Sequence, residues 1–209
     1  MKELSYLHRF EPATDPGATP LLLLHGTGGN EHDLIPFARQ LSPGSALLSP
    51  RGDVLEHGMP RFFRRFAEGV FDLADVAKRT HAMADFIVAA SARYGFDPRR
   101  LTAVGFSNGA NLAASLLLLR PEAIAGAALW RPMVVLDPPA SLSLSGKRVL
   151  ITSGRHDPIV PAADPPRLAE MLRSAGADVK LTWLETGHQL TGSDLAATKD
   201  FLGAPVSRD

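Results

Sequence analysis

The amino-acid sequence predicts an α/β fold in which a mostly parallel central sheet is covered by helices on both faces. Short runs rich in aliphatic residues alternate with longer segments whose apolar residues recur every three to four positions. Some of the short runs, such as residues 21–25, are apolar almost throughout, as strands buried on both faces are. A chain of 209 residues can form one full core but hardly two, so we expect a single domain over residues 1–209.

The short aliphatic runs predict six strands of the sheet. They cover residues 21–25, 46–49, 101–106, 124–130, 148–153 and 179–184. Residues 4–10 precede a turn rich in proline and glycine and predict an additional edge strand.

Helices are expected between these strands. Apolar side chains follow a helical spacing at Val76, Met83, Ile87, Ala90 and Tyr94, before Gly95, and a further helical run covers residues 111–120.

Two later helices carry recognisable start signals. Asp164 before Pro165 predicts an N-cap and a first-turn proline, and Gly176 marks the end of that helix. Thr191 and Asp194 have the spacing of a capping box for the last helix.

One long segment has no regular spacing. Residues 50–70 combine proline, glycine and charged residues and predict a long loop after a strand. Long loops in compact domains often line functional sites.

Composition excludes several classes of protein. The chain has 22 basic and 22 acidic residues, so it lacks the excess positive charge of a nucleic-acid-binding protein. It has no cysteine, which excludes disulfides, thiolate catalysis and cysteine-based zinc sites. No apolar stretch is long enough for a signal peptide or a membrane span, so we expect a cytoplasmic protein without integral membrane association. We also expect no metal and no cofactor.

The strongest functional motif is Gly105-Phe106-Ser107-Asn108-Gly109. It lies between a predicted strand and a predicted helix, which is the context of a G-x-S-x-G nucleophile elbow. Small residues around the serine allow the sharp turn that exposes its hydroxyl. We therefore expect Ser107 to be the nucleophile of a serine hydrolase.

A serine nucleophile needs a base, and the base needs an acidic partner. Asp157 and His188 each follow a predicted strand, in the chain order Ser, Asp, His that this kind of hydrolase uses. His156 is a rival base and Glu185 a rival acid. The order and placement favour Asp157 and His188.

An oxyanion hole should complete the site. Its expected donors are the backbone N–H groups of Asn108, after the nucleophile, and of Thr27, in the glycine loop that follows the first buried strand. The alternatives for this segment are a phosphate-binding loop and a simple glycine turn. Against the first, Glu31 stands where a dinucleotide fingerprint requires its third glycine.

Several residues on strand ends and loops are expected to face the substrate. They are Arg51, Phe62, Phe63, Trp130, Arg131, Met133, Ile159 and Val160. Arg51 and Arg131 either pair with a substrate carboxylate or tie protein segments together, and the second interpretation is favoured.

Taken together, these motifs resemble the small carboxylesterase/phospholipase family of α/β-hydrolases. The resemblance extends over nearly the whole chain. It rests on residues 25–31, 49–52, 105–109, 154–161 and 187–188. It implies a compact hydrolase of small esters with little or no lid, a Ser-Asp-His triad, no cofactor and often a homodimer.

Acyl-protein thioesterases of this family carry Gln-Gly-Gly after the serine, whereas this chain has Asn108-Gly109-Ala110, so the bacterial carboxylesterases are more similar. Alternatives with the same triad are a thioesterase, a lysophospholipase and a C–C hydrolase of aromatic ring-cleavage products. An alternative of another class is a non-catalytic binding protein on a hydrolase scaffold.

Overall fold

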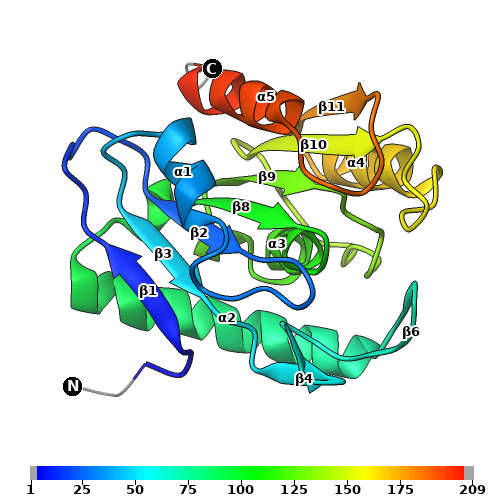
Figure 1. The fold of residues 1–209 in the computed structure, drawn as a ribbon, viewed down its shortest axis with the longest axis horizontal. Helices are drawn as coiled ribbons and strands as arrows, with labels where there is room; N and C mark the ends of the chain where they lie inside the picture. The colour runs from blue at the N-terminus through cyan, green and yellow to red at the C-terminus, as the bar shows by residue number, and fades with distance from the viewer. Residues whose placement is uncertain (1–3, 205–209) are drawn as a thin grey trace.

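A seven-stranded sheet forms the centre of the computed structural model, which describes residues 4–204 (Figure 1). The strand order is β1-β3-β2-β8-β9-β10-β11, and only β1 runs antiparallel to its neighbour. The strands are β1 (His8–Glu11), β2 (Leu21–Leu24), β3 (Leu47–Pro50), β8 (Thr102–Phe106), β9 (Gly126–Trp130), β10 (Arg148–Gly154) and β11 (Asp178–Leu184). The α/β class and the mostly parallel sheet are confirmed.

Within residues 4–204, five α-helices cover both faces of this sheet (Figure 1). They are α1 (Ile35–Leu41), α2 (Leu73–Tyr94), α3 (Asn108–Leu119), α4 (Asp164–Ser174) and α5 (Gly192–Gly203), with short 3-10 turns at Pro98–Arg100 and Pro121–Ala123. Apolar side chains of α1 and α5 pack on one face, and those of α2, α3 and α4 pack on the other.

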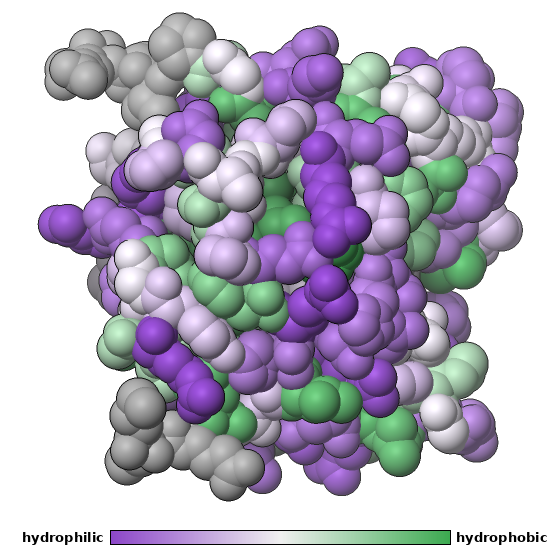
Figure 2. Space-filling view, turned by 60° about the vertical axis from the view of Figure 1, so that its left-hand side comes forward, coloured by the Kyte–Doolittle hydropathy of each residue, from purple (hydrophilic) through white to green (hydrophobic). Residues whose placement is uncertain are grey.

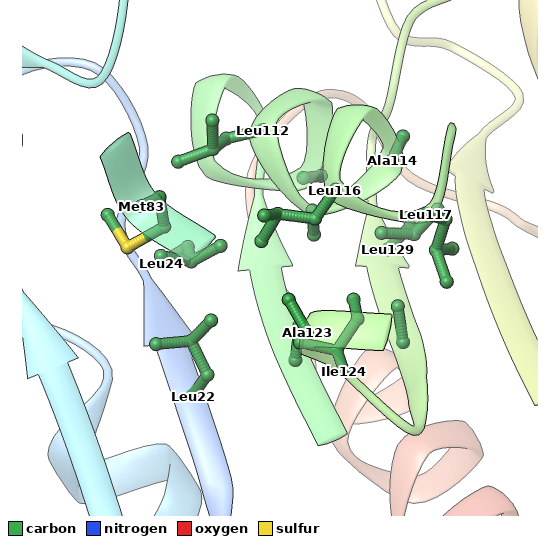
Figure 3. Close-up of a cluster of buried hydrophobic side chains, with 14 of the residues drawn as sticks. Leu22, Leu24, Met83, Leu112, Ala114, Leu116, Leu117, Ala123, Ile124 and Leu129 are labelled. Atoms are coloured by element: carbon green, nitrogen blue, oxygen red, sulfur yellow. The ribbon is translucent and has the colours of Figure 1, made fainter. Parts of the chain in front are cut away.

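Strand β2 shows why its sequence is apolar throughout. Leu21 and Leu23 pack toward α1 and α5, while Leu22 and Leu24 pack toward α2 and α3, because successive side chains of a strand point to opposite faces. Figure 3 shows Leu22 and Leu24 with Met83 of α2 and the leucines of α3. The helix layers on both faces of the sheet therefore pack against β2, the strand that precedes the glycine loop.

The expected elements differ from the observed ones in four places. The edge strand covers His8–Glu11 instead of residues 4–10, because only this part pairs with β3. Asp164 lies inside α4 after the N-cap Ala163, and its carboxylate accepts a hydrogen bond from the Val134 N–H. The short helix α1 was not expected.

The fourth difference concerns the predicted long loop. Residues 50–70 contain two small hairpins, β4 (Val54–Glu56) with β5 (Met59–Arg61), and β6 (Arg65–Ala67) with β7 (Val70–Phe71). Glycines with positive φ at positions 58 and 69 make the two turns, a conformation that glycine adopts without steric cost. Residues 51–71, the hairpin segment, thus have a defined shape outside the main sheet.

The face of the molecule in Figure 2 is predominantly hydrophilic, with hydrophobic side chains scattered in small groups. Among the described residues, no helix is both long and apolar enough to cross a membrane.

Candidate active site

Ser107 lies at the junction of β8 and α3, where the chain turns sharply. Its φ of 51° is a conformation that residues other than glycine rarely adopt, and its N–H donates to the Trp130 carbonyl at 2.8 Å. A Cβ at position 105 would lie 2.6 Å from the Gly109 carbonyl oxygen, so only glycine fits there. The strand, the helix and these contacts hold the serine in a strained turn.

Three side chains that are distant in the sequence form a hydrogen-bonded chain at the carboxyl ends of the strands. His188 Nε2 lies 3.0 Å from Ser107 Oγ, and His188 Nδ1 lies 2.8 Å from Asp157 Oδ2. A carboxylate only accepts hydrogen bonds, so Nδ1 carries the proton and Nε2 is left to accept the serine proton. This arrangement is the geometry that serine hydrolases require.

Asp157 is itself firmly held. Its side chain is 2% exposed, and its Oδ1 accepts hydrogen bonds from the N–H groups of Ile159 and Val160 at 2.8 and 3.1 Å. Only Oδ2 therefore remains for His188. The turn after β10 fixes the direction in which the carboxylate faces the imidazole.

The rival base and acid lie apart from the serine. His156 and Glu185 are both largely exposed, and His156 Nε2 lies 3.4 Å from Glu185 Oε2. Glu185 Oε1 also pairs with Arg155 Nε at 2.7 Å. Neither forms a hydrogen bond with Ser107 among the described residues.

The two expected oxyanion donors belong to the wall of one cavity. Thr27 and Asn108 both line the cavity, and in the glycine loop the N–H groups of Gly28 and Gly29 are already donated to the carbonyls of Pro60 and Gly26. The N–H of Asn108 opens α3, where the unpaired amides and the dipole of a helix favour an anion.

The hairpin segment contacts the side chains of both residues that are expected to supply the oxyanion donors. Arg61 Nη1 donates to Thr27 Oγ1 at 2.6 Å, and the Phe62 N–H donates to Asn108 Oδ1 at 2.8 Å. The Gly52 N–H donates to Nε2 of the buried His25, at the start of the glycine loop. Segments from three parts of the chain are therefore joined around the two amides.

His25 is neutral for a structural reason. Its burial lowers the pKa, and because Nε2 accepts from Gly52, Nδ1 must be the protonated nitrogen that donates to the Gly26 carbonyl at 2.7 Å. A second proton on this ring would remove the acceptor that Gly52 needs.

A cavity of about 260 Å³ lies beside Ser107 and His188. Its other lining residues are Thr27, Arg61, Arg65, Glu68, Phe71, Phe106, Asn108, Asn111, Arg131, Met133 and Ile159. A larger cavity of about 450 Å³ lies at the opposite ends of β8, β9 and β10 and contains none of the three hydrogen-bonded side chains. Ser107 and His188 therefore border the smaller cavity and not the larger one.

A family model described as phospholipase/carboxylesterase matches residues 8–205. The chain belongs to the phospholipase/carboxylesterase family. It is 43% identical over 194 residues to MhqD of Bacillus subtilis (strain 168), a protein provisionally named a hydrolase, and the match covers 93% of this chain and 96% of that protein.

Solved structures of the family have the same fold. The Bacillus cereus carboxylesterase superimposes with a TM-score of 0.91 and 44% identity, covering 93% of this chain and 92% of that one. A carboxylesterase from Mesorhizobium loti gives a TM-score of 0.87 with 35% identity, covering 92% and 91%.

Not all residues expected in the substrate pocket line this cavity. Arg131, Met133 and Ile159 do, whereas Arg51, Phe62, Phe63, Trp130 and Val160 do not. The three aromatic side chains are fully buried in the core, and Trp130 donates its indole N–H to Thr198. Val160 contributes its backbone N–H to Asp157 instead of a surface for substrate.

The two arginines that were considered for a substrate carboxylate have protein partners. Arg51 Nε and Nη2 donate to both oxygens of Glu31, at 2.5 and 2.9 Å. The fully buried Arg131 forms a two-bond pair with Asp194, at 2.7 and 3.0 Å, and also donates to the carbonyls of Gly187 and Gln189 on either side of His188. The interpretation that these arginines tie protein segments together is the one that the geometry favours.

Sequence reasoning missed six cavity residues: Arg61, Arg65, Glu68, Phe71, Phe106 and Asn111. Asn111 had a usable signal, because it lies four residues after Ser107 and therefore on the same side of the helix. The hairpin residues had none, since no periodic pattern shows how residues 51–71 fold over the site.

Within residues 4–204 no group of three or more histidine, aspartate or glutamate side chains is arranged to hold a metal ion.

Proposed function

We propose that this protein is a carboxylesterase that cleaves small carboxylic esters through an acyl-enzyme on Ser107. The observation that carries the proposal is the continuous hydrogen-bonded chain from Asp157 through His188 to the Ser107 hydroxyl, with lengths of 2.8 and 3.0 Å. Membership of the phospholipase/carboxylesterase family supports the reaction class.

In the first half-reaction, His188 takes the hydroxyl proton while Ser107 Oγ attacks the ester carbonyl carbon. The carbonyl oxygen becomes an oxyanion, which the N–H groups of Thr27 and Asn108 stabilise. The intermediate then expels the alkoxide, and His188 protonates it to the alcohol. Asp157 keeps the imidazole in the required tautomer.

In the second half-reaction, water replaces the alcohol. His188 removes a proton from the water, which attacks the acyl carbon, and the collapse of the second intermediate returns the proton to Ser107 Oγ and releases the acid. A cavity of about 260 Å³ lies below the usual size of drug-sized ligand sites, so it favours short acyl and alcohol groups.

The decisive experiment is hydrolysis of p-nitrophenyl butyrate by Ser107→Ala. We expect kcat to fall by about a millionfold, the typical cost of losing a triad nucleophile. Ser91→Ala, in which an exposed serine of α2 loses its hydroxyl, serves as the matched control and should keep wild-type activity. A Ser107→Ala enzyme that keeps most of its turnover would refute the assignment.

Covalent labelling adds a direct test of the nucleophile. A fluorophosphonate should label the wild-type protein at Ser107, and Asp157→Asn should react about 10⁴-fold more slowly because its imidazole adopts the wrong tautomer. Mass spectrometry that finds the label on another residue would contradict the mechanism.

A further inference from the structure

The side chains of two asparagines on the first turn of α3 have no role in the chemistry proposed above, which uses only the backbone N–H of Asn108. Asn108 and Asn111 are 2% and 4% exposed, and both line the cavity beside Ser107. Their side-chain amides lie within one helical turn of the nucleophile.

Backbone donors fix the orientation of both amides. Asn108 Oδ1 accepts from the Phe62 N–H at 2.8 Å, and Asn111 Oδ1 accepts from the Met133 N–H at 2.7 Å. A backbone N–H can only donate, so in each asparagine the oxygen faces the protein and the Nδ2 group is left over.

These two amide groups lack acceptors in the described part of the chain. Asn108 Nδ2 is buried with no hydrogen-bond partner, and no hydrogen bond from Asn111 Nδ2 is formed with residues 4–204. Leaving a buried donor unpaired is unfavourable, so native proteins usually supply a water or a ligand atom. Asn108 Nδ2 is closed off from solvent, so the donor that the cavity wall presents to a bound molecule is Asn111 Nδ2.

The charges around the cavity determine what kind of oxygen fits. Arg61 and Arg65 both pair with Glu56, at 3.3 and 3.0 Å, and Arg65 also pairs with Glu68. Arg131 also borders the cavity, but its guanidinium is fully buried and is paired with Asp194 on α5. Because each cation has a carboxylate to balance it, the wall offers hydrogen bonds without a net positive charge.

We propose that the Nδ2 group of Asn111 forms a subsite for a neutral oxygen acceptor of the substrate, such as a ketone, ether or hydroxyl oxygen. One helical turn, about 5.4 Å, separates the level of Asn111 from that of Ser107, which places the acceptor about three or four bonds from the scissile carbonyl carbon. Met133 and Ile159 supply the apolar wall for the intervening carbons. The inference rests on the proposed esterase function and names the class of ester.

The test compares esters that differ only by the acceptor. The acyl pair is p-nitrophenyl 4-oxopentanoate and p-nitrophenyl pentanoate, and the alcohol pair is 2-methoxyethyl acetate and butyl acetate. For each pair, kcat/KM of the ester with the additional oxygen is divided by kcat/KM of the ester without it. This ratio is then divided by the same ratio of hydroxide-catalysed hydrolysis rates, which corrects for intrinsic reactivity. We expect the corrected ratio of the wild-type enzyme to exceed one by about five- to tenfold in at least one pair, as for the gain of a hydrogen bond.

The informative variant is Asn111→Asp. It keeps an oxygen for the Met133 N–H but replaces the Nδ2 donor by a second acceptor, so the preference for the acceptor ester should disappear. Gln40→Glu makes the same amide-to-carboxylate change on the exposed helix α1 and should keep the preference. A melting curve of each variant shows that it is folded.

Either of two results would overturn the subsite: corrected wild-type ratios of one or less in both pairs, or an unchanged preference in Asn111→Asp. The first needs no variant and stands even if Asn111→Asp fails to fold. Both are distinguishable from failure of the esterase proposal, which would appear as full activity in Ser107→Ala.

Discussion

The buried pair of Arg131 and Asp194 allows a quantitative prediction for Asp194→Asn. Both side chains are fully buried, and the carboxylate accepts two hydrogen bonds from the guanidinium and one from Thr152 Oγ1 at 2.7 Å. The asparagine would leave a buried cation without its counter-charge and turn an amide NH₂ toward other donors. Breaking a buried ion pair in this way costs about 3–5 kcal/mol.

This loss should be measured by urea unfolding at pH 7. At about 2–4 °C per kcal/mol for a domain of this size, it also lowers Tm by about 6–20 °C. The matched control is Glu185→Gln, which removes an ion pair with Arg155 of similar length, 2.7 Å, but largely exposed, and should cost less than about 1 kcal/mol. Equal losses of unfolding free energy in the two variants would refute the argument that burial makes the pair of Arg131 and Asp194 the more important one for stability.

The same pair predicts a pH dependence. Burial raises the pKa of Asp194, but the hydrogen bonds from Arg131 and Thr152 outweigh it and hold the pKa below its ordinary value. Because the folded pKa is the lower one, this stabilisation is complete above the unfolded value of about 3.9 and is lost as the pH falls below it. The difference in unfolding free energy between wild type and Asp194→Asn should therefore shrink in that acid range, and a constant difference would contradict this.

Two further predictions concern the glycine turn and His25. Gly109→Ala should lower the unfolding free energy by about 3 kcal/mol, because its Cβ would overlap the Leu24 carbonyl. The control Gly192→Ala has open space around it and should change the unfolding free energy by less than about 1 kcal/mol. Urea unfolding midpoints check both, and a tolerated Gly109→Ala would show that β2 can move away. Because the folded pKa of His25 is lowered, the neutral ring stabilises the fold above about pH 6.5, and this contribution is lost as the pH falls. His25→Gln keeps an acceptor for the Gly52 N–H, so its unfolding free energy should fall less than that of wild type between pH 7 and pH 5. Parallel pH profiles of the two proteins would argue against this.

The sequence predicted those parts of the fold and site that depend on local patterns. The fully apolar β2 and the glycines around Ser107 follow from backbone rules that act over a few residues. Asp157 and His188 could be proposed because both follow strands of a parallel sheet, whose carboxyl ends meet at one edge.

Features that depend on distant partners were not predictable in the same way. The role of Arg131 depends on Asp194, which lies 63 residues away in the sequence. Phe62 and Phe63 were expected at the substrate because they lie in an irregular segment, but the hairpins turn both rings into the core. Helix α1 has only seven residues, too few for a clear periodic signal, although its buried side chains do share one face.

The contacts of the hairpin segment with Thr27 and Asn108 have a consequence for how this protein could be redesigned. The segment is inserted between β3 and α2 and makes no pairing in the main sheet, and only the rings of Phe62 and Phe63 are fully buried in the core. Yet through Arg61 and Phe62 it contacts the side chains of Thr27 and Asn108, whose N–H groups are the proposed oxyanion donors. Exchanging the hairpin residues around these two rings between relatives is therefore expected to alter turnover and ester preference while the main sheet keeps its architecture.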